Sequence, residues 1–442
     1  MKVAAGVFAP GHLGELTRLV PFEMVDDVLA VTGRVQSRVR LLPARVTVYL
    51  LLAGCLFAEL GYRQVWQRLT AGLGGLPLGT PTVSALRQAR QRLGTAPLRA
   101  LFDVLRGPAA TTATSAVRWH GLLTCVIDGT QLTVADSAAN LRRYRKARGN
   151  HGGSGYPVLR LSALLTCGTR SVIDAVFDSQ AIGELDQARR LARSLHAGML
   201  LLADRNYAAA ELINTLAATG AHLLIRGKAN RKLPRTERHH DGSWQTVIAG
   251  RPIRVIEARI AVKTTNGVTT SDYRLLTTLL DPHTHPAAQL ITLYHQRWEI
   301  ETAYLELKSS ILGGRVLRSR TPEGIDQEIH ALLTVYQLLR TAMVDATDSR
   351  PGLDPDRASF TTALNTARDQ LIHAAGIITD TVIDLIGTIG AHILNNLLPE
   401  RRIRLKTRMI KRSNSKYQAR GPNIDRRTYQ ATTSINIVSP DP

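Results

Sequence analysis

Two short apolar runs, each followed at once by an aspartate, constrain the fold of this chain more than any other feature. Leu122–Ile127 precedes Asp128-Gly129-Thr130, and Met199–Ala203 precedes Asp204-Arg205-Asn206-Tyr207. Runs of this length and composition are typical of buried strands. The patterns around them predict further strands at 156–167, 171–178 and 222–226, and helices at 184–196 and 208–219. The order β-β-β-α-β-α-β predicts an α/β fold with a mixed sheet and a carboxylate at the end of its first and fourth strands.

A third acid lies in the stretch Tyr294–Lys308, which has no Pro or Gly and is predicted to be helical. At roughly 100° per residue, one stripe of this helix carries a phenol, two cations and one acid: Tyr294, Arg297, Glu301 and Lys308. Glu299 and Glu306 fall on the opposite side. A solvated face with charge pairing would give the same pattern in an arbitrary helix. The two strand-end aspartates favour a functional role, with Glu301 as their partner.

The composition indicates a polyanionic partner. The net charge is +21 and the isoelectric point is about 10.5, which favours double-stranded DNA over a membrane because the charge is spread along the chain. Three cysteines without paired spacing argue against a disulfide framework or a zinc site, and for a reducing cytosol. The apolar stretch Val46–Ala58 is too short to span a bilayer and is predicted to be a buried helix. We therefore expect a cytoplasmic, nucleoid-associated protein.

Three regions are expected along the chain. Residues 1–115 are predicted to form a helical N-terminal DNA-binding domain, 116–340 the catalytic domain with a β-rich insertion at 227–275, and 341–442 helices and a basic tail that is ordered, if at all, on DNA. In the first region a helix at 82–94 offers Arg87 and Arg90 to phosphates and base edges. A basic helix packed on its own domain is the alternative. A basic loop at 140–151 is predicted to lie over DNA, or to be a plain solvated loop.

The acids would support phosphodiester chemistry if the following three met at one end of the sheet: Asp128, Asp204 and Glu301. Carboxylates suit two Mg²⁺ ions, for which Mn²⁺ can substitute, one activating the attacking hydroxyl and the other stabilising the leaving oxygen. Arg297 and Lys308 would grip phosphates on either side of the scissile bond, and Tyr294 would hydrogen-bond a phosphate or stack on an extruded base. Neither an acyl-transfer Ser elbow nor an ATP-binding phosphate loop is present in the sequence.

Four other acids in the same region compete for these roles: Asp136, Asp174, Asp178 and Asp186. Asp136 and Asp178 are the serious alternatives because they lie near predicted strand ends. Asp174 lies inside a predicted strand and is expected to face solvent.

These motifs together resemble the DDE transposases of insertion-sequence-4 type. The resemblance rests on Asp128-Gly129-Thr130, on Asp204-Arg205-Asn206-Tyr207, and on the Tyr-x2-Arg-x3-Glu-x6-Lys pattern of Tyr294, Arg297, Glu301 and Lys308. The stretch Ala85-Leu86-Arg87-Gln88-Ala89-Arg90 is similar to part of the family's N-terminal domain, so that the resemblance covers about 20–340.

The resemblance implies a ribonuclease-H-like sheet with a β insertion between the second Asp and the Glu. It also implies Mg²⁺-dependent cleavage at terminal inverted repeats, strand transfer into target DNA, and a homodimer in a synaptic complex. A hairpin intermediate would require base flipping, for which Trp244 and Trp298 are candidate stacking residues; each is more often a packed core aromatic. The alternatives are a DNA-binding regulator or inactive remnant that does not cut, and a repair or recombination nuclease on the same sheet.

Overall fold

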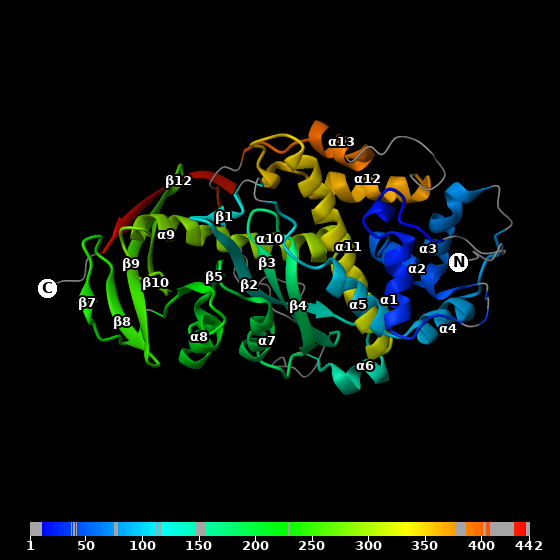
Figure 1. The fold of residues 1–442 in the computed structure, drawn as a ribbon, viewed down its shortest axis with the longest axis horizontal. Helices are drawn as coiled ribbons and strands as arrows, with labels where there is room; N and C mark the ends of the chain where they lie inside the picture. The colour runs from blue at the N-terminus through cyan, green and yellow to red at the C-terminus, as the bar shows by residue number, and fades with distance from the viewer. Residues whose placement is uncertain are drawn as a thin grey trace.

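The computed structural model describes residues 11–36, 38, 40, 42–74, 78–111, 114, 116–146, 155–228, 230–375, 386–400, 404–406 and 428–438. The molecule is elongated, with helices α1–α5 at one end, strands β7–β10 at the other and the rest of the sheet between them (Figure 1). The α-helices are α1 (Phe22–Val31), α2 (Ala44–Leu56), α3 (Tyr62–Thr70), α4 (Val83–Leu93), α5 (Ala96–Leu105), α6 (Ala138–Arg143), α7 (Glu184–Leu191), α8 (Ala210–Ala217), α9 (Ala287–Tyr294), α10 (Glu299–Leu305), α11 (Pro322–Asp348), α12 (Phe360–Ile372) and α13 (Gly387–Asn395).

One large mixed sheet organises the chain. Its main path consists of β2 (Leu122–Thr133), β3 (Val158–Thr166), β4 (Val172–Ser179), β5 (Met199–Ala203), β6 (His222–Arg226), β9 (Arg251–Thr264), β10 (Gly267–Thr277), β11 (Arg404–Lys406) and β12 (Thr428–Ile437), in the spatial order β11-β12-β9-β10-β6-β5-β2-β3-β4. The meander β2-β3-β4 is antiparallel, whereas β5 runs parallel to both β2 and β6. This order is ribonuclease-H-like, and the predicted fold class is confirmed.

Strand β2 does not end at Asp128, which corrects the sequence-based boundary. Its pairing with β5 stops at Val126 and Leu202, but its pairing with β3 continues to Thr133 and Val158. The apolar run of β2 ends close to the point where its pairing with β5 stops. Beyond that point β2 has a neighbouring strand, β3, on one side only. Asp128 therefore lies within a strand, just past the end of the parallel pairing.

The two faces of the sheet are buried in separate cores, because successive side chains of a strand point to opposite faces. Val126 and Leu202 belong to the core that also contains residues of α9, α10 and α11. Ile127 and Leu201 belong to the second core, which is closed by α7 and α8. Even-numbered positions near the ends of β2 and β5 therefore face the α9–α10 side.

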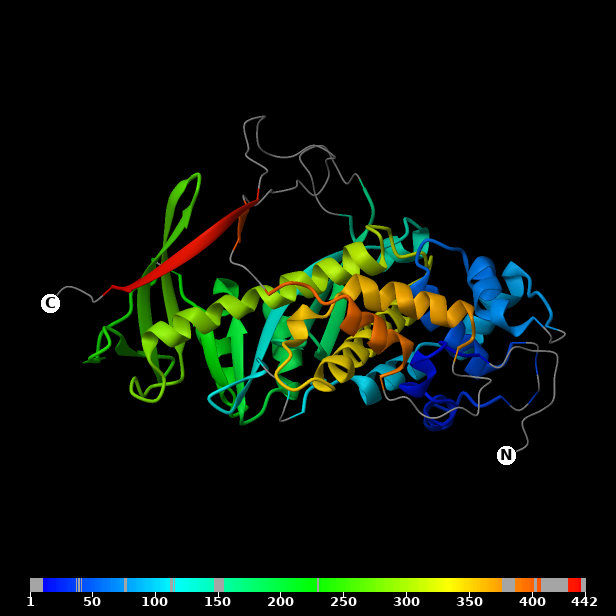
Figure 2. The same ribbon diagram turned by 90° about the horizontal axis from the view of Figure 1, so that it is seen from above.

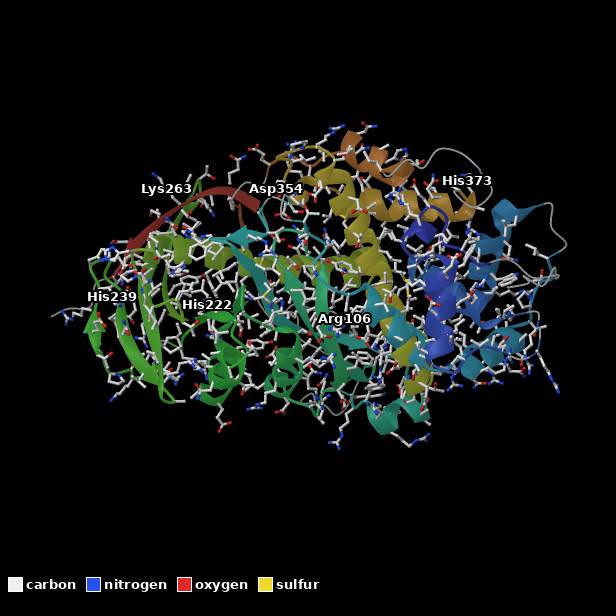
Figure 3. All side chains as sticks on the ribbon, viewed as in Figure 1. Arg106, His222, His239, Lys263, Asp354 and His373 are labelled. Carbon is white, nitrogen blue, oxygen red and sulfur yellow. The ribbon has the colours of Figure 1, made fainter. Side chains whose placement is uncertain are left out.

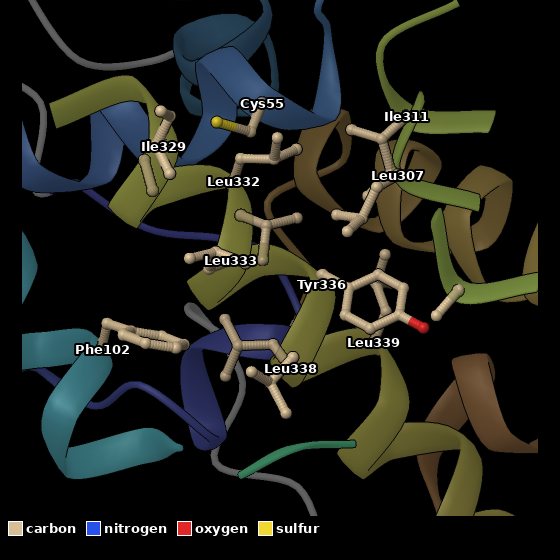
Figure 4. Close-up of a cluster of buried hydrophobic side chains, with 14 of the residues drawn as sticks. Cys55, Phe102, Leu307, Ile311, Ile329, Leu332, Leu333, Tyr336, Leu338 and Leu339 are labelled. Carbon is tan, nitrogen blue, oxygen red and sulfur yellow. The ribbon is translucent and has the colours of Figure 1, made fainter. Parts of the chain in front are cut away.

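The N-terminal helices share one continuous core with the α9–α11 side of the sheet. Helix α2 is buried along nearly its whole length, as predicted, and packs with α5 against the long helix α11. Figure 4 shows Cys55 of α2 and Phe102 of α5 beside Leu332 and Leu333 of α11. Within the described part of the chain, no helix is both long and apolar enough to cross a membrane.

The predicted β-rich insertion is present, and it extends the central sheet. Short strands β7 (Glu237–Arg238) and β8 (Trp244–Ile248) pair in series with β9, which forms a long hairpin with β10 around Asn266-Gly267. Strand β10 then pairs with β6, so the insertion continues the sheet edge. The small strand β1 (Arg118–Trp119) pairs with β2.

The C-terminal region differs from its expectation in one respect. Strand β12 pairs with β9 over Ala431–Ile437, so part of the tail is ordered against the protein itself. Figure 2 shows β12, in red, lying along the β9–β10 hairpin. Helices α12 and α13 lie in this region, which was expected to contain helices, whereas most of the basic run of the tail lies outside the described residues.

Candidate active site

Two of the three predicted acids lie side by side. Val126 of β2 pairs with Leu202 of the parallel strand β5, and Asp128 and Asp204 each follow two residues later. Both aspartates therefore lie just past the end of the parallel pairing of β2 with β5, on the α9–α10 side of the sheet. The Asp204 carboxylate accepts the Asn206 backbone N–H at 2.7 Å and so caps the turn after β5.

The segment that carries Glu301 is helical throughout but is not the regular α-helix that was predicted. Helix α9 passes into a 3-10 turn at His295–Trp298, then into α10, and then into a π-helical turn at Glu306–Ile311. π-helical turns are frequent at functional sites. The predicted separation of the acids is nevertheless observed, because Glu299 and Glu306 are buried while the Glu301 side chain is 36% exposed.

Arg297 stands between the first and third acids. Its guanidinium nitrogens lie 3.9 Å from an Asp128 carboxylate oxygen and 3.8 Å from a Glu301 carboxylate oxygen. These distances are too long for hydrogen bonds but close enough for strong electrostatic attraction. Lys308 donates to the Thr130 hydroxyl at 3.3 Å, from the same side.

These groups border a hollow of about 390 Å³. The lining residues are Asp128, Gly129, Thr130, Glu301, Tyr304, Leu305, Lys308 and Ser309. Asp204 is not part of this lining; it lies beside Asp128 on the neighbouring strand. The sheet thus brings one acid, Asp128, to this opening, and the helical segment brings an acid and a cation, Glu301 and Lys308.

Burial raises the pKa of Asp128 to about 7. Its neighbours Glu184 and Asp204 contribute to this rise, whereas the Gly129 backbone N–H and Arg297 oppose it. Negative charge is therefore crowded around Asp128, and a bound cation would relieve this crowding.

Two residues near Asp128 were not identified from the sequence. Glu184 begins α7, where an acid is ordinary because of the helix dipole, so no sequence pattern indicates its place beside Asp128. A Cβ at Gly129 would lie 2.7 Å from a Glu184 carboxylate oxygen, so glycine is what lets this carboxylate approach β2. Tyr304 donates to the Asp128 carbonyl at 2.6 Å and accepts the Ala163 N–H at 3.1 Å. The position of Tyr304, one helical turn after Glu301, is the sequence signal that could have identified it.

The rival acids are each held by a basic side chain. Asp136 pairs with Lys146, Asp178 with Arg143 and Arg190, and Asp186 with Arg189. The expectation that Asp174 faces solvent was wrong. Its carboxylate is fully buried and pairs with Arg193 and with Arg106, which Figure 3 labels.

The predicted aromatic contacts need revision. Tyr294 is buried and its hydroxyl donates to the Ala203 carbonyl at 3.0 Å, so it supports the end of β5 and is not placed to meet a phosphate or a base. Trp244 is also buried, in the core under the insertion, and is a packed aromatic. Trp298 is 41% exposed and its ring lies 5.0 Å from the Arg297 guanidinium carbon, which leaves it accessible.

The predicted recognition helix is α4, capped by the Thr82 hydroxyl and ended by Gly94, as its sequence indicates. Arg87 is exposed. Arg90 is half-buried, with its guanidinium carbon 4.1 Å from the centre of the Tyr62 ring. The two arginines therefore differ in how freely they can reach DNA.

The donors around Asp128 are all carboxylates, which fits a hard divalent cation and not a zinc site. Over the residues that the structure describes, no group of three or more His, Cys, Asp or Glu side chains is placed to hold a metal ion together. The carboxylates thus suit a hard divalent cation chemically. Their side chains would have to move closer together to bind one ion.

Comparison with known proteins identifies family matches over most of the chain. Residues 10–103 match the family described as insertion element 4 transposase N-terminal, and residues 119–338 match the transposase DDE domain. The chain is 27% identical over 410 residues to transposase InsG for insertion sequence element IS4 of Escherichia coli (strain K12), covering 89% of this chain and 91% of that protein. It is 25% identical over 205 residues to the putative transposase InsZ of the same organism, covering 46% and 67%.

A solved structure, the piggyBac transposase synaptic complex with hairpin DNA, aligns over 87% of this chain and 85% of that chain with a TM-score of 0.43 and 9% identity. This likeness is too distant to add to the argument. Transposases bind DNA, and DDE domains generally use divalent metal ions. The two family matches, in the order of the helical region and the acid-bearing sheet, show that the chain belongs to the insertion-sequence-4-type DDE transposases and is a DNA transposase.

Proposed function

We propose that this transposase moves its element by cut-and-paste, with Mg²⁺-dependent cleavage at the terminal inverted repeats followed by strand transfer into target DNA. Asp128, Asp204 and Glu301 are the proposed metal ligands, for two Mg²⁺ ions that Mn²⁺ can replace. The observation that carries this proposal is the meeting of Asp128 and Glu301 across one hollow, with Asp204 on the adjacent parallel strand.

The residues around the hollow have separate tasks in this scheme. When bound, the metal ions supply activation of the attacking hydroxyl and stabilisation of the leaving oxygen. Arg297 and Lys308 bind phosphate oxygens on either side of the scissile bond, because both cations lie beside the acids. Tyr304 and Tyr294 hold the backbone at Asp128 and just before Asp204, and so fix the two strands on which the acids stand.

Arg297 has two successive partners in this proposal. Without DNA it offsets the charge of Asp128 and Glu301. When DNA and metal are bound, it transfers to a phosphate and leaves the carboxylates to the cations. Its long contacts with both acids are consistent with such an exchange, because no tight hydrogen bond has to be broken.

The remaining DNA contacts are proposed from exposure. Arg87 of α4 contacts the element end, with Arg90 in a weaker role because it stacks on Tyr62. Trp298 is the proposed platform for a base near the cleavage site, since an aromatic face accepts any base. We further propose a homodimer in the synaptic complex, one copy cutting each end, acting at the nucleoid.

The test is Glu301→Gln, which keeps the size of the side chain and removes its charge. We expect unchanged affinity for a duplex carrying the element end, and loss of Mg²⁺-dependent cleavage by roughly 10²-fold or more. Glu211→Gln is the matched control, because Glu211 lies on α8 with a side chain that is 89% exposed. Cleavage that survives Glu301→Gln would refute the proposed roles. A wild-type chain that binds ends without cutting them would favour a regulator or an inactive remnant instead.

A further inference from the structure

A second cluster of charges lies on the opposite side of the helical segment that carries Glu301, and it is buried. Arg170, in the turn between β3 and β4, donates through Nε to Glu299 at 2.5 Å and through Nη1 to Glu306 at 3.3 Å. Its remaining nitrogen pairs with Asp356, which follows α11. We call these residues, with Arg340, the Arg170 cluster.

The Arg170 cluster is closed by helix α11. Arg340 pairs with Glu306, and the Tyr336 hydroxyl donates to the same carboxylate at 3.0 Å. Tyr336 in turn accepts from Arg340 Nε at 3.1 Å. Two cations and three carboxylates thus lie together where the sheet, the helical segment that carries Glu301 and helix α11 meet.

The spacing along the helical segment links this cluster to the active site. Glu299 precedes Glu301 by two residues, and Glu306 precedes Lys308 by two residues. Each anchored acid faces inward, while the residue two positions later faces the hollow. A shift of either anchored acid would therefore move a side chain that lines the hollow.

Arg170 also connects the helix to the strand that carries Asp128. It stands at the tip of the β3–β4 hairpin, with a φ of +55°, and β3 pairs directly with β2 at Ala163 and Asp128. A non-glycine residue in this left-handed region is uncommon, and such conformations persist where the surroundings enforce them. The three contacts of the guanidinium supply such surroundings.

We propose that Arg170 is a positioning residue for the transposition reaction, which sets the distance between Asp128 and the pair Glu301 and Lys308 by gripping Glu299 and Glu306. The inference rests on the proposed roles of Glu301 and Lys308. Stability alone does not account for the cluster, because buried ion pairs can often be replaced by apolar groups without loss of stability. A forked guanidinium, by contrast, fixes geometry at several points at once.

The first variant is Arg170→Lys, which keeps the charge but cannot hold three carboxylates in one plane. The full-length chain is assembled on a duplex carrying the element end. Cleavage is measured against Mg²⁺ concentration, Mn²⁺ binding by electron paramagnetic resonance, end affinity by titration, and folding by melting temperature. We expect at least a tenfold lower cleavage rate at limiting Mg²⁺, partly restored by high Mg²⁺, a matching loss of Mn²⁺ affinity, and end affinity within twofold of the wild type.

Arg193→Lys is the control, because Arg193 also forks onto a buried carboxylate, but that carboxylate, Asp174, lies on β4 and not on the helical segment that carries Glu301. It should leave the Mg²⁺ midpoint unchanged. If Arg170→Lys does not fold, Glu299→Ala takes its place, since removing one of three acids leaves charges balanced. The expected shift is then smaller, about threefold, and in the same direction.

A Mg²⁺ midpoint and Mn²⁺ affinity that stay at wild-type values in the folded variant would overturn the inference, even if the rate fell with the folded fraction. Failure of the proposed function is distinguished by Glu301→Gln in the same assay. If Glu301→Gln still cuts, the metal-ligand assignment falls whatever Arg170→Lys does. If Glu301→Gln is inactive and the Arg170→Lys midpoint is unchanged, only the positioning role falls.

Discussion

Two arginines, Arg297 and Arg170, stand on opposite sides of one helical segment, and each faces more than one carboxylate. Arg297 lies 3.8 to 3.9 Å from Glu301 and Asp128, beside a hollow that is open to solvent. Arg170 makes hydrogen bonds to Glu299, Glu306 and Asp356 in the interior. The same types of side chain are loosely associated on one side and tightly bound on the other.

The difference reflects what each cluster has to do. A site that exchanges an arginine for metal ions and phosphates must keep its charges accessible and its hydrogen bonds weak. A buried cluster must satisfy every charge, because an uncompensated buried ion is costly. The helical segment therefore carries acids for exchange at Glu301 and acids for anchoring at Glu299 and Glu306.

The largest contrast is expected in stability. Arg170→Met should lower the free energy of unfolding by about 3–5 kcal/mol, because it leaves buried carboxylates without their partner. Arg297→Met should lower it by less, because its contacts with Asp128 and Glu301 are longer than hydrogen bonds, yet it should abolish cleavage. Urea unfolding of both variants, followed by tryptophan fluorescence, makes the comparison. Equal losses of stability would show that the two clusters do not differ as described.

A second contrast is expected in pH dependence. The pKa of Asp128 is raised in the folded state to about 7 from the model-compound value of 3.8. A raised pKa means that the protonated form is favoured by folding, so this stabilisation is present below pH 3.8 and is lost as pH rises through 7. Asp128→Asn should therefore be more stable than the wild type at pH 8 in metal-free buffer, with the gain shrinking toward pH 4. Melting temperatures across this range provide the measurement, and a gain independent of pH would contradict the assignment.

Much of this arrangement could be predicted from the sequence where the pattern is local. Strands Met199–Ala203 and His222–Arg226 have the boundaries expected from their apolar runs, and α4 lies where a helix was predicted, at 82–94. The opposed faces of Glu301 and Glu299 followed from helical geometry, although the π-helical turn after Leu305 did not.

The other errors involve partners that are distant in the sequence. Asp174 was expected to face solvent because its pairing with Arg193 and Arg106 joins three separate segments. Trp244 was a candidate for base stacking because an indole in a β-rich region can be exposed or buried, and only the packing of the insertion decides between them. The strand β12 was missed because its register is set by β9, far upstream.

The third expected effect concerns the response of the hollow at Asp128 and Glu301 to a divalent cation. At a Mg²⁺ concentration ten times the dissociation constant, binding to the folded state alone adds about 1.4 kcal/mol of stability. For a chain of 442 residues, with an unfolding entropy of about 2.1 cal/mol/K per residue, the melting temperature should rise by roughly 1.5 °C. Glu301→Gln should lose most of this rise, whereas Glu211→Gln should keep it. An equal rise in both variants would place the bound cation away from the Asp128 and Glu301 hollow.

The smallest expected effect concerns two arginines of α4, one accessible to solvent and one packed within the protein. Arg87 is exposed, whereas Arg90 stacks on Tyr62 and so already has a partner within the protein. If Arg87 contacts a phosphate, Arg87→Ala should weaken end binding at low salt and reduce the slope of log affinity against log salt by about one. Arg90→Ala should change that slope less and lower the melting temperature more, because it removes a packed cation–π contact worth roughly 0.5–2 kcal/mol. Binding titrations at several salt concentrations measure both slopes, and a larger change for Arg90 would mean that this arginine leaves Tyr62 when DNA binds.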